Sequence, residues 1–136
     1  MAEPKTVLFL CPHGAAKSVL AAAYFDRLAR ERGLSLRAAF AGTEPDDELS
    51  PRVVAALREE GMDVSGRRPR RVGREDLAGA HRVISLGCAL GELAPPGAAV
   101  ERWDDVPPAG SDLDATRDAI RRHVASLVAE LERQRA

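Results

Sequence analysis

One stretch of this chain, residues 6–23, restricts the possible folds more than any other, because its pattern changes from strand to helix within a few residues. Residues 6–10 (TVLFL) form a short apolar run of strand-favouring side chains, which is typical of a strand buried on both faces. From Ser18 onward the sequence is rich in alanine and leucine with helical spacing, and this pattern continues to about Gly33. The stretch therefore predicts the first strand and helix of an α/β fold.

A tight loop of small residues, CPHGAAKS at positions 11–18, lies between the predicted strand and helix. Amides of such a loop can turn inward, and the positive end of the helix dipole points at whatever they enclose, so the loop is expected to bind an oxyanion. Cys11 stands at the mouth of the loop and Lys17 closes it, which predicts a thiolate nucleophile inside an anion site. The alternatives are a buried, inert Cys11 and a Lys17 that faces solvent at the start of the helix.

The rest of the chain alternates between strand and helix patterns. Strands are predicted at 36–41, 81–86 and 100–103, a helix from Ser50-Pro51 to Gly61, a brief helix at 75–79, a turn at 94–97 and a long helix from Ser111 to the end. The alternation predicts one α/β domain over 1–136, with three layers and a four-stranded, mainly parallel sheet that carries helices on both faces. Ligands of such folds bind beyond the carboxyl ends of the strands. The loop 11–18, Gly87-Cys88 and the loop 103–110 are therefore expected to meet at one rim.

Composition narrows the classes of function. A chain of 136 residues with a formal net charge of -1 gives no reason to expect nucleic acid or a membrane as a partner. The chain has no apolar run of membrane-spanning length and no signal-peptide layout, so we expect a cytoplasmic protein. Its two cysteines are then reactive or simply buried rather than a structural disulfide. Together with the three histidines they lack zinc-ligand spacing, and no metal site is expected.

These motifs resemble the low-molecular-weight protein tyrosine phosphatase superfamily, which includes the thioredoxin- and mycothiol-coupled arsenate reductases. Cys11, five intervening residues, a basic residue and Ser18, entered from VLFL, match the signature loop of that superfamily. The resemblance extends over nearly the whole chain, through AGTEP at 41–45, GMDVS at 61–65, the strand at 83–86 and Arg117-Asp118. It implies the α/β fold described above and a cysteine nucleophile.

Three details resemble the reductase branch more than the phosphatases: His13, Gly87-Cys88, and Trp103-Asp104 before a proline loop that lacks the tyrosine of the phosphatases. The resemblance therefore implies an arsenate-reductase-like enzyme in which the Cys11 thiolate attacks arsenate or a similar oxyanion. It implies no bound cofactor, and an external thiol (mycothiol, glutathione or a thioredoxin) as reductant. The residues that it assigns to the oxyanion cradle are Pro12, His13, Gly14, Ala15, Ala16, Lys17 and Ser18, with Ser18 bonding the sulfur, capping the helix, or both.

The chain departs from the family at three positions. The arginine that ends the family's loop is replaced by Lys17, a movable point charge instead of a planar fork. The family's asparagine is replaced by Gly14, which removes a side-chain brace of the loop. The family's general acid, an aspartate before proline, aligns with Pro107. Asp105 is the nearest candidate acid and Asp104 the next, unless both are solvated loop carboxylates.

Cys88 is a candidate resolving thiol. The three-thiol relay of thioredoxin-coupled reductases cannot operate here because the chain has no third cysteine. Two routes remain, a Cys11–Cys88 disulfide or attack on the covalent adduct by an external thiol. The alternative is that Cys88 only fills space at the end of a strand.

Two further functions stay open. One is a phosphatase that cleaves phosphomonoesters through a cysteinyl-phosphate, with Asp105 as acid. The other is a catalytically degenerate oxyanion-binding or regulatory module, which Lys17 and the missing Asp-Pro pair favour. The arginine-rich segment 65–74 is a solvated loop, a means of attracting an anionic substrate, or the source of a guanidinium that compensates for Lys17.

Overall fold

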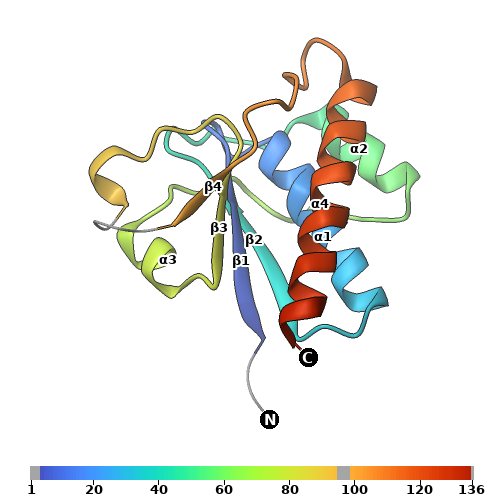
Figure 1. Cartoon of the computed structure of the whole chain (residues 1–136). Coiled ribbons are helices and arrows are strands. Elements are labelled where there is room, and N and C mark those ends of the chain that lie inside the picture. Colours follow the sequence, from blue (N-terminus) through green and yellow to red (C-terminus); the bar gives the residue numbers. More distant parts are fainter. Residues whose placement is uncertain (1–3, 95–98, 136) are drawn as a thin grey trace.

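The computed structural model describes residues 4–94 and 99–135, and Figure 1 shows the course of the chain. Strands and helices alternate as the sequence predicts, apart from the predicted turn, of which residues 95–97 lie outside the described residues. The elements in chain order are β1 (Lys5–Leu10), α1 (Lys17–Glu31), β2 (Leu36–Ala41), α2 (Pro51–Glu59), α3 (Arg74–Gly79), β3 (Arg82–Ser85), the 3-10 turn η1 (Gly91–Leu93), β4 (Val100–Arg102) and α4 (Leu113–Arg135).

The four strands form one sheet in the order β2-β1-β3-β4, and every pairing is parallel. Helices α1, α2 and α4 cover one face of the sheet, and α3 with η1 lies on the other (Figure 1). The predicted three-layer α/β fold is therefore confirmed. Because all strands run in the same direction, the loops that follow β1, β3 and β4 emerge at the same edge.

The central strand β1 explains why both faces of the sheet are covered. Val7 and Phe9 point into the core shared with α1 and α4, whereas Leu8 and Leu10 point into the core under α3. All four side chains are at most 1% exposed. The uninterrupted apolar run in the sequence is thus the signature of a strand with no solvent-facing side.

Helix boundaries follow local capping. The Ser50 hydroxyl accepts a hydrogen bond from the amide of Val53 at 3.4 Å and caps α2 as predicted. Helix α4 begins at Leu113 rather than at Ser111, because the carboxylate of Asp112 accepts a hydrogen bond from the amide of Ala115 at 3.0 Å and takes the capping position. The turn η1 has no counterpart in the sequence prediction. None of the helices in the described part of the chain has the length and hydropathy needed to cross a membrane.

Candidate active site

The predicted nucleophile lies where the sheet meets the first helix. Cys11 directly follows β1, and its thiol donates a hydrogen bond to the hydroxyl of Ser18 at 3.1 Å. Cys11 is 4% exposed and Ser18 is fully buried in the first turn of α1. In the thiolate form the sulfur accepts this hydrogen bond instead, and the start of the helix adds its positive dipole end. The two residues at the ends of the predicted loop are thus brought together.

The loop between them is held from outside by the backbone of the segment 41–50. Amides of Glu44, Asp46 and Ser50 donate to the carbonyls of Pro12, His13 and Ala15, at 2.8, 3.1 and 2.9 Å respectively. In a trans peptide the N–H and C=O groups point in opposite directions. The outward carbonyls of Pro12 and Ala15 therefore turn the following amides of residues 13 and 16 toward the inside of the loop, as an oxyanion cradle requires.

Gly14 lets the loop approach the end of β2 at backbone distance. Its φ of 59° is left-handed, and a Cβ there would lie 2.8 Å from the nitrogen of Gly42 and 2.9 Å from the carbonyl carbon of Ala41. A Cβ on Gly42 would lie 2.6 Å from the nitrogen of Gly14. The two glycines face each other with no room for a side chain on either. Backbone contact with the segment 41–50 thus takes the place of the side-chain brace that the resemblance attributes to asparagine.

We expect Gly14→Ala to destabilise the protein more than Gly61→Ala. Gly61 also has a positive φ, of 83°, but a Cβ there meets no described atom within 4 Å. Both variants incur the left-handed strain of about 1–2 kcal/mol, and Gly14→Ala adds a backbone clash of roughly 1–3 kcal/mol. Denaturant unfolding of the two variants measures the difference. Equal losses of stability would contradict the close approach of Gly14 to Gly42.

Lys17 reaches the rim above β3. Its Nζ atom lies 3.5 Å from the position that a Cβ on Gly87 would occupy, and Gly87, two residues after the end of β3, has a φ of 85°. The sequence alone leaves the direction of this side chain open. The structure brings the Lys17 amine to the same edge of the sheet as Cys11, next to Gly87.

The His13 side chain lies outside the loop. Its Nδ1 atom is 3.2 Å from the carbonyl oxygen of Glu44 and 3.2 Å from a carboxylate oxygen of Asp46. Both the imidazole and the Asp46 carboxylate are more than half exposed. His13 therefore contributes its backbone to the loop, while its imidazole braces the loop against the segment 44–46.

Cys88 packs on the other side of the sheet from Cys11. Its thiol donates to the hydroxyl of Thr43 at 3.5 Å, and the side chain belongs to the core under α3. The Ser85 hydroxyl accepts from the Cys88 amide at 3.0 Å and donates to the Cys88 carbonyl at 2.9 Å. Both cysteines are free and buried. A disulfide with Cys11 therefore requires at least one thiol to leave its packed position.

The two candidate acids lie on the loop after β4. The Asp105 carboxylate is 2.7 Å from Nε2 of His123 on α4, and this hydrogen bond holds the pKa of Asp105 below its usual range. Asp104 accepts a hydrogen bond from Nε of Arg102 at 3.0 Å. Within the described residues, the contacts of both carboxylates lie away from the loop 11–18.

Three arginines of the segment 65–74 have local partners. Arg70 pairs with Asp76 at 3.1 Å, Arg71 donates to the carbonyl of Thr43 at 2.7 Å, and the guanidinium of Arg67 lies 4.5 Å from the centre of the Phe40 ring. The segment also joins the end of β2 through a parallel bridge between Gly42 and Arg71. These three arginines therefore lie along the β2 edge, each with its own partner. Among residues 4–94 and 99–135, no three His, Cys, Asp or Glu side chains gather as metal ligands would.

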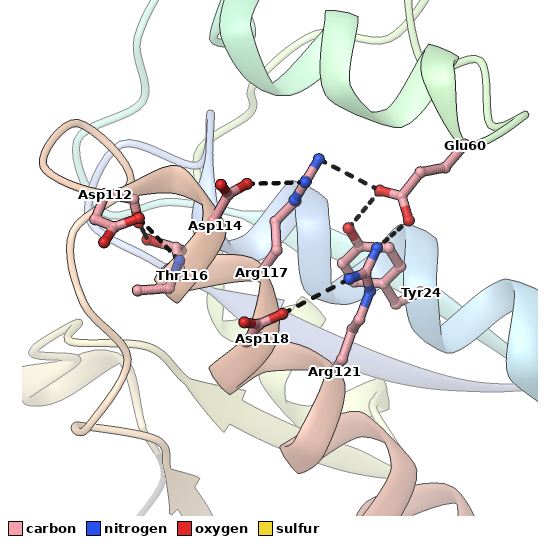
Figure 2. A network of polar contacts seen from close by, with 9 residues as sticks. Tyr24, Glu60, Asp112, Asp114, Thr116, Arg117, Asp118 and Arg121 are labelled. Atoms are coloured by element: carbon pink, nitrogen blue, oxygen red, sulfur yellow. Dashed lines mark hydrogen bonds and ion pairs between the residues drawn. The ribbon is translucent and has the colours of Figure 1, made fainter.

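Figure 2 shows a polar network that sequence reasoning missed. The hydroxyl of Tyr24 donates to the Glu60 carboxylate at 2.7 Å, and Arg117 and Arg121 of α4 also pair with that carboxylate. Burial of Glu60 opposes its ionisation, but the hydrogen bond from Tyr24 and the two guanidinium groups hold the pKa of Glu60 below its usual value. Only the four-residue spacing of the arginines on one helix face is visible in the sequence. The network ties α1 and α4 to the end of α2, the helix whose other end abuts the loop 11–18.

This network predicts a loss of stability at high pH. Burial, followed by the hydrogen bond to Glu60 and its negative charge, raises the pKa of Tyr24 from 10.0 to about 12. The folded state thus favours the neutral phenol, and this contribution of about 2 kcal/mol is complete below pH 10 and lost between pH 10 and 12. Tyr24 is the only tyrosine, so phenolate absorbance reports it directly. We expect Glu60→Gln to lower the titration midpoint, and an unchanged midpoint would contradict the network.

Comparisons with known proteins agree with this geometry. The model for the family "low molecular weight phosphotyrosine protein phosphatase" matches residues 6–136. The chain is similar to a putative arsenate reductase of Halobacterium salinarum, with 31% identity over 125 residues that cover 90% of this chain and 87% of the relative.

Solved structures share the fold. The arsenate reductase of Archaeoglobus fulgidus superimposes with a TM-score of 0.74 at 30% identity, covering 90% of this chain and 98% of that one. The thioredoxin-dependent arsenate reductase of Corynebacterium glutamicum superimposes with a TM-score of 0.80 at 26% identity, covering 98% of this chain and 65% of that one. The likeness therefore extends over nearly the whole chain.

Proposed function

The chain belongs to the low molecular weight phosphotyrosine protein phosphatase family, and on that premise we propose that it is a thiol-dependent oxyanion enzyme of the arsenate-reductase kind. One observation carries the proposal: the contact of 3.1 Å between Cys11 and Ser18 across a loop that opens onto the start of α1. That contact supports a site in which a nucleophile, a hydrogen-bond donor to sulfur and an anion cradle act together. The relatives at 30–31% identity support the reductase branch of the family.

Each residue of the loop has a role in this proposal. Cys11 attacks the oxyanion as a thiolate, and the Ser18 hydroxyl donates a hydrogen bond to the sulfur. The inward amides and the helix N-terminus hold the oxyanion oxygens. Lys17 supplies a positive charge from the rim above β3.

The chemistry balances in three steps. Attack of the Cys11 sulfur on arsenate forms an S–As bond and breaks an As–O bond, and the oxygen leaves as water after taking up protons. A second thiol then attacks the Cys11 sulfur. The electron pair of the S–As bond stays on arsenic, which leaves as arsenite, while a disulfide forms with the attacking thiol. Another thiol reduces that disulfide and restores Cys11.

The attacking thiol is, in our proposal, an external one. Cys88 is the only other cysteine of the chain, and it lies buried in the core on the opposite side of the sheet. Attack by an external thiol requires no movement of that core. Mycothiol, glutathione and a thioredoxin are the candidates, and the last is the reductant named for the Corynebacterium structure.

Phosphomonoester hydrolysis is the second candidate function, and the name of the family itself favours it. That reaction needs a proton donor beside the leaving oxygen. Asp105, the candidate donor, is hydrogen-bonded to His123, and its lowered pKa keeps it ionised. We therefore rank the phosphatase activity below the reductase activity.

The test is a comparison of reactions with the wild-type protein. Arsenite formation is measured with glutathione, mycothiol and a thioredoxin system supplied separately, and hydrolysis of an aryl phosphate is measured in parallel. We expect arsenite formation with one thiol system, which then identifies the reductant. Ester hydrolysis alone would assign the phosphatase function instead. If neither reaction is detected, an oxyanion-binding module becomes the favoured function.

A further inference from the structure

A stacked cluster joins the loop after β4 to the middle of α4. The ring centres of Trp103 and His123 are 4.6 Å apart, and the ring planes differ by 13°. The Nε2 atom of the same imidazole lies 2.7 Å from the carboxylate of Asp105. The imidazole of His123 thus makes two contacts with the loop: its ring face stacks on Trp103, and its Nε2 atom contacts Asp105.

The loop has a second attachment to the same helix. The hydroxyl of Thr116 lies 3.0 Å from the carbonyl of Pro107 and 3.2 Å from that of Pro108, and Thr116 is fully buried. The side chains of His123 and Asp105 are instead 30% and 68% exposed. The attachment at Thr116 is a fixed anchor, whereas the one at His123 contains ionisable groups in contact with water.

The attachment at His123 lies beside the aromatic core of the domain. Trp103 packs against Phe9, and Phe9 packs against Phe25, each pair with ring centres 5.7 Å apart. Phe25 lies about 10 Å along α1 from Ser18, the residue that contacts the Cys11 thiol. The hydrogen bond to His123 therefore holds the Asp105 carboxylate on the side of the loop that faces α4.

We propose that His123 is a positioning residue that docks Asp105 onto α4 when the imidazole is protonated, and that loss of the proton releases the carboxylate. The proposal rests on the proposed function only in treating Asp105 as a candidate proton donor. The docked position is one in which Asp105 does not serve the Cys11 loop. Release makes it available there.

The physical basis is a double contact that depends on the proton. A charged imidazole forms a charge-assisted hydrogen bond to the carboxylate, and it also lies over the electron-rich face of the indole. Neutral imidazole weakens both contacts. The lowered pKa of Asp105, caused first by its hydrogen bond with His123, agrees with this coupling.

Three other charged groups lie around the stacked rings. Glu101 of β4 accepts a hydrogen bond from the indole Nε1 at 2.7 Å and pairs with Arg82 of β3 at 2.8 Å. Arg122 directly precedes His123 on α4, and its positive charge helps to lower the pKa of Asp105. Asp105 is therefore the carboxylate whose removal is expected to change how His123 is held beside Trp103.

Trp103 provides the test, because it is the only tryptophan of the chain. A protonated imidazole in contact with indole quenches its fluorescence, so the emission reports the charge and contact of His123. We expect the emission of the wild-type protein to rise in one step as the imidazole loses its proton. Asp105→Asn is expected to reduce the height of that step, because the imidazole then lacks the carboxylate that holds it beside the indole. His123→Gln is expected to abolish the step.

Asp104→Asn is the matched control, since it removes the neighbouring carboxylate, which pairs with Arg102 instead. Its emission step is expected to equal that of the wild-type protein. A step height that Asp105→Asn leaves unchanged, or a wild-type emission without a step, would overturn the proposal. These measurements require no turnover, so they stand whether or not the protein reduces arsenate.

Discussion

Replacing Cys11 by serine is expected to abolish turnover and to leave the fold intact. A serine hydroxyl at this position can keep the hydrogen bond to Ser18 that the thiol makes at 3.1 Å. It is, however, a far weaker nucleophile and cannot form the disulfide that releases arsenite. We expect a loss of roughly 10³-fold or more, in line with the removal of other catalytic nucleophiles. Arsenite formation and aryl phosphate hydrolysis measure it.

Cys88→Ser is the matched control for this substitution. Serine at position 88 can keep the bond to Thr43 and the backbone contacts with Ser85. If an external thiol resolves the adduct, Cys88→Ser retains most of the activity. A loss with Cys88→Ser similar to that with Cys11→Ser would assign the resolving step to Cys88. Full activity of Cys11→Ser would refute the assignment of the nucleophile.

The agreement between sequence and structure is best where the signals are local. The buried run of β1, the cap at Ser50 and the glycine after α2 each act within a few residues, and the elements that they delimit are confirmed. The parallel sheet follows from their alternation. The family resemblance rests on the signature loop that ends in Ser18, and the match of the family model to residues 6–136 confirms it.

The side-chain partners within the site could not be predicted in this way. Gly14 meets Gly42 and Asp105 meets His123 only after folding, across 28 and 18 positions of the chain. No feature of the sequence identifies the partner of either residue in such a pair. The side of the sheet on which Cys88 packs depends likewise on the turn that the Ser85 hydroxyl closes. Long-range contacts therefore decide what the loop residues can do.

Two departures from the family loop have different consequences in the structure. Glycine at position 14 is explained by the backbone of Gly42, which leaves no space for a side chain. The contacts of the described residues give no such steric reason for lysine at position 17, whose amine lies next to Gly87. The backbone of the loop 11–18 thus has the contacts that an oxyanion site requires, whereas the cation at its end is a lysine amine instead of a guanidinium.

Lys17→Arg is therefore expected to raise turnover by about tenfold or more. A guanidinium can grip two oxyanion oxygens at once, whereas the lysine amine offers a single movable charge. Preorganised donors of this kind contribute about 10²–10³-fold to catalysis when they are aligned with the transition state. The gain should fall mainly on kcat, because both cations bind the ground-state oxyanion. Steady-state kinetics with arsenate and with an aryl phosphate measure the change.

Lys5 is the other lysine of the chain and lies at the exposed start of β1, so Lys5→Arg is the matched control and should leave kcat unchanged. Lys17→Met keeps the length of the side chain without its charge and should lower kcat. A large gain with Lys17→Arg would mean that the loop, its brace and its nucleophile already support catalysis and that the charge limits the rate. No gain would mean that the limit lies elsewhere, and the docked position of Asp105 on His123 is then the next feature to change.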